Sequence, residues 1–250
     1  MRKVLGQLLL LTDHIYARSE ADQDAFIKLG ANRHKVSLIG NLKYSPPSSH
    51  VIEKPQVSRE YVVAASTHAD EELKILRCWL KLNRNELLVI APRHPERRDE
   101  ILKQLTGLTG MIAVRSRNET ITETTKVYLL DTVGELNNWF AGARLVIMGG
   151  SFIPRGGHNL LEPAHFGKAV IFGPSMENFR EEARLMLSKH AAVQVASIDR
   201  LCDQLQHFLA NPEALRSLEN NVAETTAGFS HIVDDYADII SSRMSVDIHE

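Results

Sequence analysis

The chain has 250 residues, of which 44% are hydrophobic and 24% are charged, values that are typical of a globular protein with a substantial core. The formal net charge of -2, from 29 Lys and Arg against 31 Asp and Glu, gives no electrostatic reason to expect nucleic acid as a partner. No stretch reaches the ~20 apolar residues of a membrane span, so any membrane contact would be peripheral.

The two cysteines, Cys78 and Cys202, are far apart in the sequence and have no Cys or His neighbours at metal-binding spacing. We therefore expect neither a disulfide framework nor a zinc site, and a reducing compartment fits best. The pair Asp234-Asp235 does not form an Asp-x-Asp motif at a strand end, so no metal and no other cofactor is predicted.

The first 49 residues contain a short run of elements that ends in a linker. The apolar run 8–11 is too short for a signal peptide and is interpreted as the tail of a helix. A strand at 13–18, a helix at 20–29 and a strand at 36–39 follow, and Ser19 and Gly30 are expected to begin and end that helix. Two prolines in 45–49 indicate a stiff linker and a domain boundary.

Beyond the linker, strands and helices alternate regularly, which predicts an α/β fold: a Rossmann-like domain with a parallel sheet and helices on both faces. The expected strands are 61–65, 87–91, 111–114, 127–130, 145–147, 169–172 and 193–196. The expected helices are 70–82, 97–105, 134–141, 159–166, 179–189, 200–209 and 212–225.

A glycine-rich turn at 149–158 joins a buried strand to a helix. Its four glycines remove Cβ atoms that would keep a ligand away, and they permit positive φ angles that direct N–H groups into one concavity. Asn159 and Glu162 would also suit a capping box, which needs no ligand. Arg155 and His158 are not explained by capping, so anion binding is favoured at this strand end.

Two other strand ends carry polar groups. Ser66, Thr67 and His68 follow the strand at 61–65, although Thr67 with Asp70 would also serve as a helix cap. Four basic or potentially basic side chains lie within 93–98, and the Arg93 guanidinium offers a fork that matches phosphate or carboxylate. The turn at 131–135 is explained equally well by a helix start and by a direct ligand contact.

Together these stretches resemble the C-terminal half of the 3-deoxy-D-manno-octulosonic acid (Kdo) transferases of Gram-negative bacteria. The matching motifs are Gly40-Asn41-Leu42-Lys43, Ser66-Thr67-His68, Ala91-Pro92-Arg93-His94-Pro95-Glu96-Arg97, Gly149-Gly150-Ser151, Gly156-Gly157-His158-Asn159 and Leu161-Glu162-Pro163. Because several ordered motifs match over nearly the whole chain, the resemblance is far more specific than a single glycine pattern.

The resemblance implies a GT-B glycosyltransferase, in which two Rossmann-like domains face each other across a cleft. Such an enzyme transfers Kdo from CMP-Kdo to a lipid A precursor in lipopolysaccharide biosynthesis, at the cytoplasmic face of the bacterial inner membrane, with inversion and without a metal. By this resemblance, the Glu162 carboxylate would accept hydrogen bonds from the ribose hydroxyls of CMP, with Asn159 beside it. Arg93, His94 and the Gly150-Ser151 backbone would hold the phosphate and the Kdo carboxylate.

The same resemblance divides the chain into a remnant of the N-terminal acceptor domain (1–44), a CMP-sugar-binding Rossmann-like domain (45–228) and a C-terminal crossover helix (229–250). The substrate-binding set is completed by Ser66, Thr67, His68 and His158 and by Asn41 and Lys43 at the domain junction. No catalytic residue is expected in this chain, since the family's general base belongs to the acceptor domain. We therefore expect donor binding without Kdo transfer.

Two alternatives to the transferase remain open: a CMP-sugar-binding module without catalytic activity, and a related GT-B enzyme that acts on a UDP-sugar. The last helix carries an apolar face, which in GT-B proteins packs on the N-terminal domain. We expect this face to contact residues 1–44, to remain partly uncovered and to promote association. Its members are Ile232, Val233, Tyr236, Ile239, Ile240 and Met244.

Overall fold

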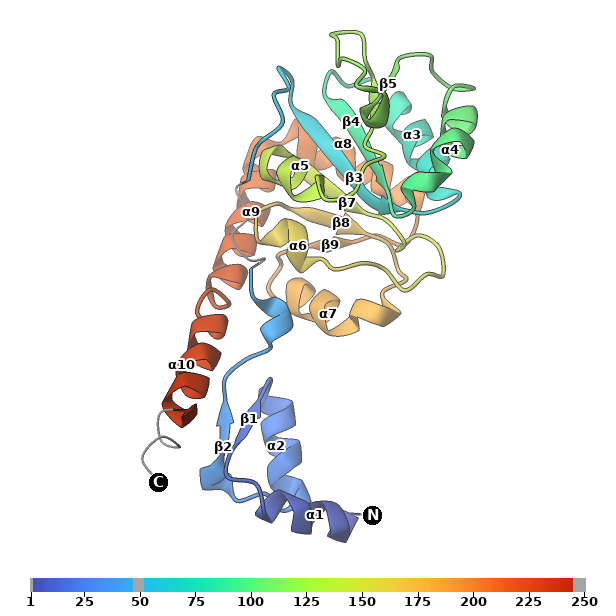
Figure 1. Ribbon diagram of the computed structural model, residues 1–250. Coiled ribbons are helices and arrows are strands. Elements are labelled where there is room, and N and C mark those ends of the chain that lie inside the picture. The colour runs from blue at the N-terminus through green and yellow to red at the C-terminus, as the bar shows by residue number, and fades with distance from the viewer. Residues whose placement is uncertain (1, 47–51, 245–250) are drawn as a thin grey trace. The chain divides into compact units, whose positions relative to one another are not determined.

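The structure is a computed structural model that describes residues 2–46 and 52–244, and it divides into two compact units (Figure 1). The smaller unit is built from Met1–Pro46 and Ala227–Glu250, and the larger unit from Pro47–Thr226. Most of the predicted linker at 45–49 lies outside the described residues. Within the described ranges, no helix combines the length and the apolar character that a membrane crossing requires.

The smaller unit contains a pair of parallel strands, β1 (Ile15–Ala17) and β2 (Val36–Leu38), with helices α1 (Arg2–Leu10) and α2 (Glu20–Leu29). Helix α2 begins and ends as its sequence predicts. The Ser19 hydroxyl accepts a hydrogen bond from the Asp22 N–H at 3.1 Å, and Gly30 adopts the left-handed conformation that ends many helices.

Helix α10 (Ile232–Met244) packs on the other elements of this smaller unit. The Ile232 side chain is buried beside Gly40, and the Tyr236 hydroxyl donates a hydrogen bond to the Gly40 carbonyl at 3.2 Å. Val233 and Ile240 stay exposed, by 49% and 57%. The expectation that this helix contacts the first 44 residues and remains partly uncovered is confirmed.

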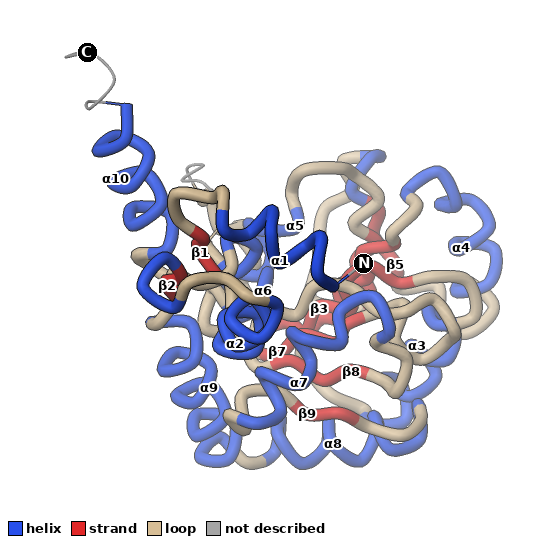
Figure 2. Tube along the Cα trace, turned by 90° about the horizontal axis from the view of Figure 1, so that it is seen from below, coloured by secondary structure: helices blue, strands red, loops and turns tan. Residues whose placement is uncertain are grey.

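The larger unit is organised around a seven-stranded, fully parallel sheet with strand order β5-β6-β4-β3-β7-β8-β9. Figure 2 labels β3, β5, β7, β8 and β9 of this sheet. The strands are β3 (Tyr61–Thr67), β4 (Leu87–Pro92), β5 (Ile112–Val114), β6 (Val127–Leu129), β7 (Leu145–Met148), β8 (Val170–Phe172) and β9 (Val193–Gln194). The chain passes from β3 to β4 on one side, whereas β7 pairs with β3 on the other side.

Helices cover both faces of this sheet, so β4 and β7 and the first five residues of β3 are apolar and buried. The helices are α3 (Glu71–Leu82), α4 (Arg98–Leu105), α5 (Leu136–Gly142), α6 (Leu161–Ala164), α7 (Arg180–Ser188), α8 (Ile198–Ala210) and α9 (Pro212–Ala227). Helix α3 packs against α4 and α8, and α5 contacts β3 and α6. The predicted α/β architecture is therefore confirmed.

The two cysteines are the clearest error of the sequence interpretation. Cys78 on α3 and Cys202 on α8 are joined by a disulfide, with Cα atoms 5.5 Å apart. We expected no such bond because 124 residues separate the two positions. Separation along the chain does not measure distance here, since α3 and α8 pack side by side on the same face of the sheet.

Candidate functional site

The candidate site lies at the carboxyl ends of β3, β4, β7 and β8, which a parallel sheet brings to one edge. Because β4 and β7 lie on opposite sides of β3, the loops after β3 and β7 diverge at this point. In open α/β sheets, ligands bind in the crevice that such a change of direction creates. The structure thus brings the predicted Ser66–His68, Arg93–His94 and Gly149–Asn159 segments to one edge.

The glycines of the β7 loop are required by close contacts. A Cβ atom on Gly149 would lie 2.6 Å from the Ser66 carbonyl oxygen and 2.6 Å from the Thr67 Cα, and this backbone has no room to yield. Gly150 has a φ of +64°, and a Cβ there would lie 2.9 Å from the His158 ring. The loop can therefore approach β3 and the histidine only without side chains.

Ser151 fastens this loop to the next strand. Its side chain is buried, and the hydroxyl donates to the Met148 carbonyl at 2.5 Å and accepts from the Gly173 N–H at 2.7 Å. The hydroxyl is therefore engaged within the protein, and a ligand contact from Ser151 would have to come from its backbone.

A buried carboxylate that the sequence interpretation did not single out, Glu71, ties the β3 and β7 loops together. Its oxygens accept hydrogen bonds from the N–H groups of His68, Gly150 and Phe152 at 2.9, 2.7 and 3.0 Å. Burial raises the pKa of Glu71, and the three N–H donors oppose that rise. The Gly150 N–H is thus already used, and Glu71 fixes the loop shape.

The start of α3 differs from the predicted Thr67 cap. Helix α3 begins at Glu71, and Asp70, which precedes it, has a φ of +72° and makes no side-chain cap. Thr67 is instead the last residue of β3, and its buried hydroxyl donates to Glu72 at 3.2 Å. The predicted cap was wrong because the loop uses the Glu71 carboxylate to accept the orphan His68 N–H.

Three histidines gather beside the glycine loop. The Nε2 atoms of His68 and His158 are 2.9 Å apart, and the two ring planes are nearly parallel, with an interplanar angle of 8° and centroids 5.2 Å apart. The His94 ring packs edge-on against His68, with centroids 5.6 Å apart. Burial and then the positive potential of His158, His94, Arg155 and Arg97 lower the pKa of His68 to about 4. Burial, with Arg93 and His94 nearby, also lowers the pKa of His158.

Two arginines of the site make no ion pair with the residues that the structure describes. Arg93, after β4, and Arg155, in the β7 loop, have exposed side chains that make no hydrogen bond or ion pair with any described residue. Arg97, in contrast, pairs with the buried Glu72 at 2.9 Å, and Arg98 pairs with Asp99. His94 also has a carboxylate neighbour, because its Nδ1 lies 3.1 Å from Glu96 Oε1. Of the four predicted basic side chains in 93–98, Arg93 alone therefore makes no ion pair with a described residue.

Asn159 and Glu162 border the same loop, but not as a capping box. Helix α6 begins at Leu161, and the Asn159 side chain accepts a hydrogen bond from the Leu161 N–H at 3.0 Å. The predicted helix at 159–166 was too long because the loop extends through Leu160. Reduced hydration raises the pKa of the exposed Glu162, while a hydrogen bond with the Asn159 side chain and the charge of Arg93 oppose that rise.

The remaining predicted residues lie at other places. Ser66, in β3, has a φ of +52° and a partly exposed side chain. Asn41 and Lys43 belong to the smaller unit, where the Asn41 side chain accepts a hydrogen bond from the Lys43 N–H at 3.1 Å. Among residues 2–46 and 52–244, no group of three His, Cys, Asp or Glu side chains is placed to hold a metal ion.

The turn after β6 is explained by contacts within the protein. The Asp131 carboxylate accepts from the Ser116 N–H and hydroxyl at 2.9 and 2.5 Å, and Thr132 donates to Glu135. The side-chain oxygens of Asp131 and Glu135 therefore hold the turn together. This supports the interpretation of 131–135 as a helix start over that of a direct ligand contact.

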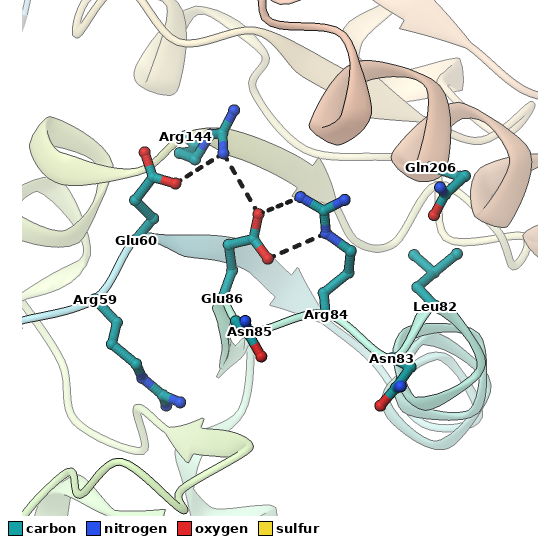
Figure 3. A pocket seen from close by; sticks show the side chains of 9 residues that line it. All are labelled: Arg59, Glu60, Leu82, Asn83, Arg84, Asn85, Glu86, Arg144 and Gln206. Carbon is teal, nitrogen blue, oxygen red and sulfur yellow. Dashed lines mark hydrogen bonds and ion pairs between the residues drawn. The ribbon is translucent and has the colours of Figure 1, made fainter.

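A pocket of about 630 Å³ lies at the opposite, amino-terminal edge of the sheet (Figure 3). Glu86 accepts from Arg84 at 2.6 Å and from Arg144 at 3.4 Å, and Arg144 also pairs with Glu60 at 2.8 Å. These residues precede β4, β7 and β3, so the ion pairs connect the starts of three adjacent strands. We assign this network to stability, because its charges neutralise one another.

The parallel sheet and these loops define a Rossmann-like α/β domain. The structure is similar to the C-terminal CMP-Kdo binding domain of WaaA from Acinetobacter baumannii, with 34% identity, a TM-score of 0.64 and coverage of 67% of this chain and 89% of that domain. Anabaena HepE in complex with UDP-glucose shares the fold, with 16% identity, a TM-score of 0.54 and coverage of 96% of this chain and 67% of HepE.

The chain belongs to the 3-deoxy-D-manno-octulosonic acid transferase family. The Rickettsia bellii transferase is 29% identical over 253 aligned residues, which cover 96% of this chain and 60% of that protein. The chain thus spans less than two thirds of the length of the curated relatives that it matches. No family model matches the sequence.

Proposed function

We propose that this chain binds CMP-Kdo and forms the donor-binding part of an enzyme that transfers Kdo to a lipid A precursor. The observation that carries the proposal is the convergence of two unpaired cations, Arg93 and Arg155, with His68 and His158 around a glycine loop. The similarity to a domain described as CMP-Kdo binding in WaaA supports this choice of ligand. The acceptor and a place at the cytoplasmic face of the inner membrane are inferred from the family.

The proposed donor pose follows from the charges. CMP-Kdo carries a phosphate and a carboxylate, and Arg93, His94 and His158 are the groups that would meet them. Of the Gly150-Ser151 backbone beneath, the Ser151 N–H would take part, since the Gly150 N–H already donates to Glu71. As the bond between the phosphate and the sugar breaks, negative charge grows on the phosphate. Fixed cations and N–H dipoles at this position would stabilise that charge without reorganising.

Glu162 and Asn159 would bind the ribose. A carboxylate beside the phosphate site is a good acceptor for two hydroxyl groups. Reduced hydration raises the pKa of Glu162, and the positive charge of Arg93 acts against that rise. Ser66, Thr67 and His68 would complete the phosphate side of the pocket, with the Thr67 hydroxyl acting through Glu72 rather than on the ligand.

The test is calorimetric titration of the 250-residue chain with CMP and with UMP. We expect CMP to bind more tightly than UMP, because the alternative of a UDP-sugar enzyme requires the reverse order. The Glu162→Gln variant should bind CMP roughly 10- to 100-fold more weakly, since a charge-assisted hydrogen bond is worth about 1.5 to 3 kcal/mol.

A control variant separates binding from folding. Glu224→Gln changes an exposed carboxylate on α9 and should leave CMP affinity unchanged. Both variants should melt near the wild-type temperature, because neither side chain is buried in the core. Equal CMP affinity of wild type and Glu162→Gln would remove the ribose assignment, and an absence of CMP binding would remove the proposed function.

A further inference from the structure

The contact between His68 and His158 limits how many protons the two rings can hold. A distance of 2.9 Å between the two Nε2 atoms is an N–H···N hydrogen bond, so one ring donates and the other accepts. One additional proton can be placed on a free Nδ1 without breaking this bond. A second would force two N–H groups to face each other. The neutral pair can therefore gain one additional proton, but not two.

The positive charges around the pair keep both imidazole rings neutral when no anion is bound. Arg93, Arg97 and His94 approach from the β4 side, and Arg155 approaches from the β7 loop. The nearby carboxylates do little to offset them. The Glu71 oxygens accept three backbone N–H groups, and Glu72 pairs with Arg97. Glu162 interacts electrostatically with Arg93, and the Glu96 carboxylate lies 3.1 Å from the Nδ1 atom of His94, on the exposed side of the β4 turn.

We propose that the His68–His158 pair takes up one proton when the phosphate dianion of a nucleotide occupies this site. The inference rests on the proposed function, because it requires a nucleotide phosphate beside Arg93 and Arg155. The dianion would cancel the positive potential that now disfavours an imidazolium, and the proton would come from the solvent. Binding and protonation are therefore coupled, and each favours the other.

This coupling has a definite sign. In the free protein, the pKa of His68 lies near 4 and that of His158 is lowered, so both rings are neutral at pH 7. A bound dianion raises these values, so the complex holds more protons than the free protein, and nucleotide affinity must increase as the pH falls. The phosphate itself gains a proton near pH 6, so measurements belong above that value.

The test is isothermal titration calorimetry with CMP at pH 7.5, in several buffers that differ in ionisation enthalpy. At this pH nearly all the CMP is already dianionic and gains no proton itself, so a net uptake of protons from the buffer means that the protein is protonated on binding. For wild type we expect the apparent enthalpy to change with buffer ionisation enthalpy in the direction of proton uptake. The double variant His68→Gln with His158→Gln, which keeps polar side chains but has no imidazole at this place to gain a proton, should lose this dependence.

His207→Gln, on the exposed surface of α8, is the matched control and should keep the wild-type uptake. NMR spectra of the histidine rings, recorded on the wild-type protein with and without CMP, should show one new imidazolium when CMP is bound. This measurement does not depend on any substitution. CMP binding without proton uptake would overturn this inference and leave the proposed function intact. Uptake that persists in the double variant would also overturn it. A failure of CMP to bind would remove both.

Discussion

At the scale of single residues, the candidate site depends on which cations remain unpaired. Arg93 and Arg97 are four positions apart on the same turn, but only Arg97 has a carboxylate partner, the buried Glu72. A guanidinium held by a buried acid is part of the scaffold, whereas one that projects freely can exchange water for a ligand anion. The functional difference between these two arginines is therefore set by α3, which supplies the acid.

We predict that Arg93→Ala weakens CMP binding and flattens its dependence on salt. An exposed cation attracts the phosphate through a field that salt screens, so removal of the cation removes the screened part of the affinity. The measurement is a CMP titration at low and high ionic strength. Arg98→Ala is the control, because Arg98 is already paired with Asp99. An Arg93→Ala variant with unchanged affinity at both salt concentrations would make this turn a solvated surface.

Residue patterns indicated the location of the site but not its internal bonding. The pairs Gly149-Gly150 and Gly156-Gly157 predicted a loop that a ligand can approach, whereas the contacts of a Cβ on Gly149 show that the backbone of β3 also requires glycine there. Glu71 was missed because an acid in the first turn of a helix is ordinary in a sequence. Only the three-dimensional placement shows that it accepts N–H groups from two different loops.

At the scale of elements, the two edges of the sheet have different tasks. The carboxyl edge holds glycines, unpaired arginines and histidines, whereas the amino edge holds Glu86 in ion pairs with Arg84 and Arg144. Arg84 also donates to the Leu209 carbonyl at the end of α8, so this network joins a strand start to a helix end. Such contacts stabilise the sheet far from the candidate site.

We predict that Glu86→Gln lowers the free energy of unfolding at pH 7 by about 1.5 to 3 kcal/mol, the usual worth of a hydrogen bond to a charged group. Burial acts to raise the pKa of Glu86, but the Arg84 hydrogen bonds prevail and the pKa is lowered below its ordinary value of 4.5. A lowered pKa gives stability that is present above pH 4.5 and is lost as the pH falls through the folded value.

The measurement is urea unfolding of wild type and Glu86→Gln at pH 7 and at several values below pH 4.5. The difference between the two proteins should be largest at pH 7 and should shrink in acid. Glu123→Gln, a change at an exposed carboxylate, should stay within about 0.5 kcal/mol of wild type. CMP affinity should be the same in all three proteins at pH 7. A pH-independent difference would mean that Glu86 contributes through packing instead of charge.

Most of the elements could be predicted because their signals are local. Ser19 and Gly30 define α2, and uninterrupted apolar runs define β3, β4 and β7. The pairing of Cys78 with Cys202 and the short helix α6 could not be predicted, since both depend on tertiary packing. The cysteines meet only because α3 and α8 share one face of the sheet, and α6 is shortened by the loop that precedes it.

At the scale of the whole molecule, the larger unit contains the complete sheet and all the loops of the candidate site. The similar domain of WaaA corresponds to 67% of this chain, which is close to the extent of the larger unit. The family resemblance, however, also assigns Asn41 and Lys43 of the smaller unit to donor binding. The two assignments make different predictions for a fragment.

We predict that residues 52–226 alone fold and bind CMP, but more weakly than the whole chain. If Asn41 and Lys43 contact the donor, their loss removes at least one charge-assisted hydrogen bond, which corresponds to roughly 10- to 100-fold in affinity. The double variant Asn41→Ala with Lys43→Ala, made in the whole chain, should bind CMP as weakly as the fragment. Calorimetry on the three proteins, with circular dichroism to verify folding, provides the comparison. Equal affinity of the fragment and the whole chain would assign CMP binding to the larger unit alone. If the fragment binds CMP more weakly but the double variant binds it like wild type, the missing contact lies elsewhere in the smaller unit.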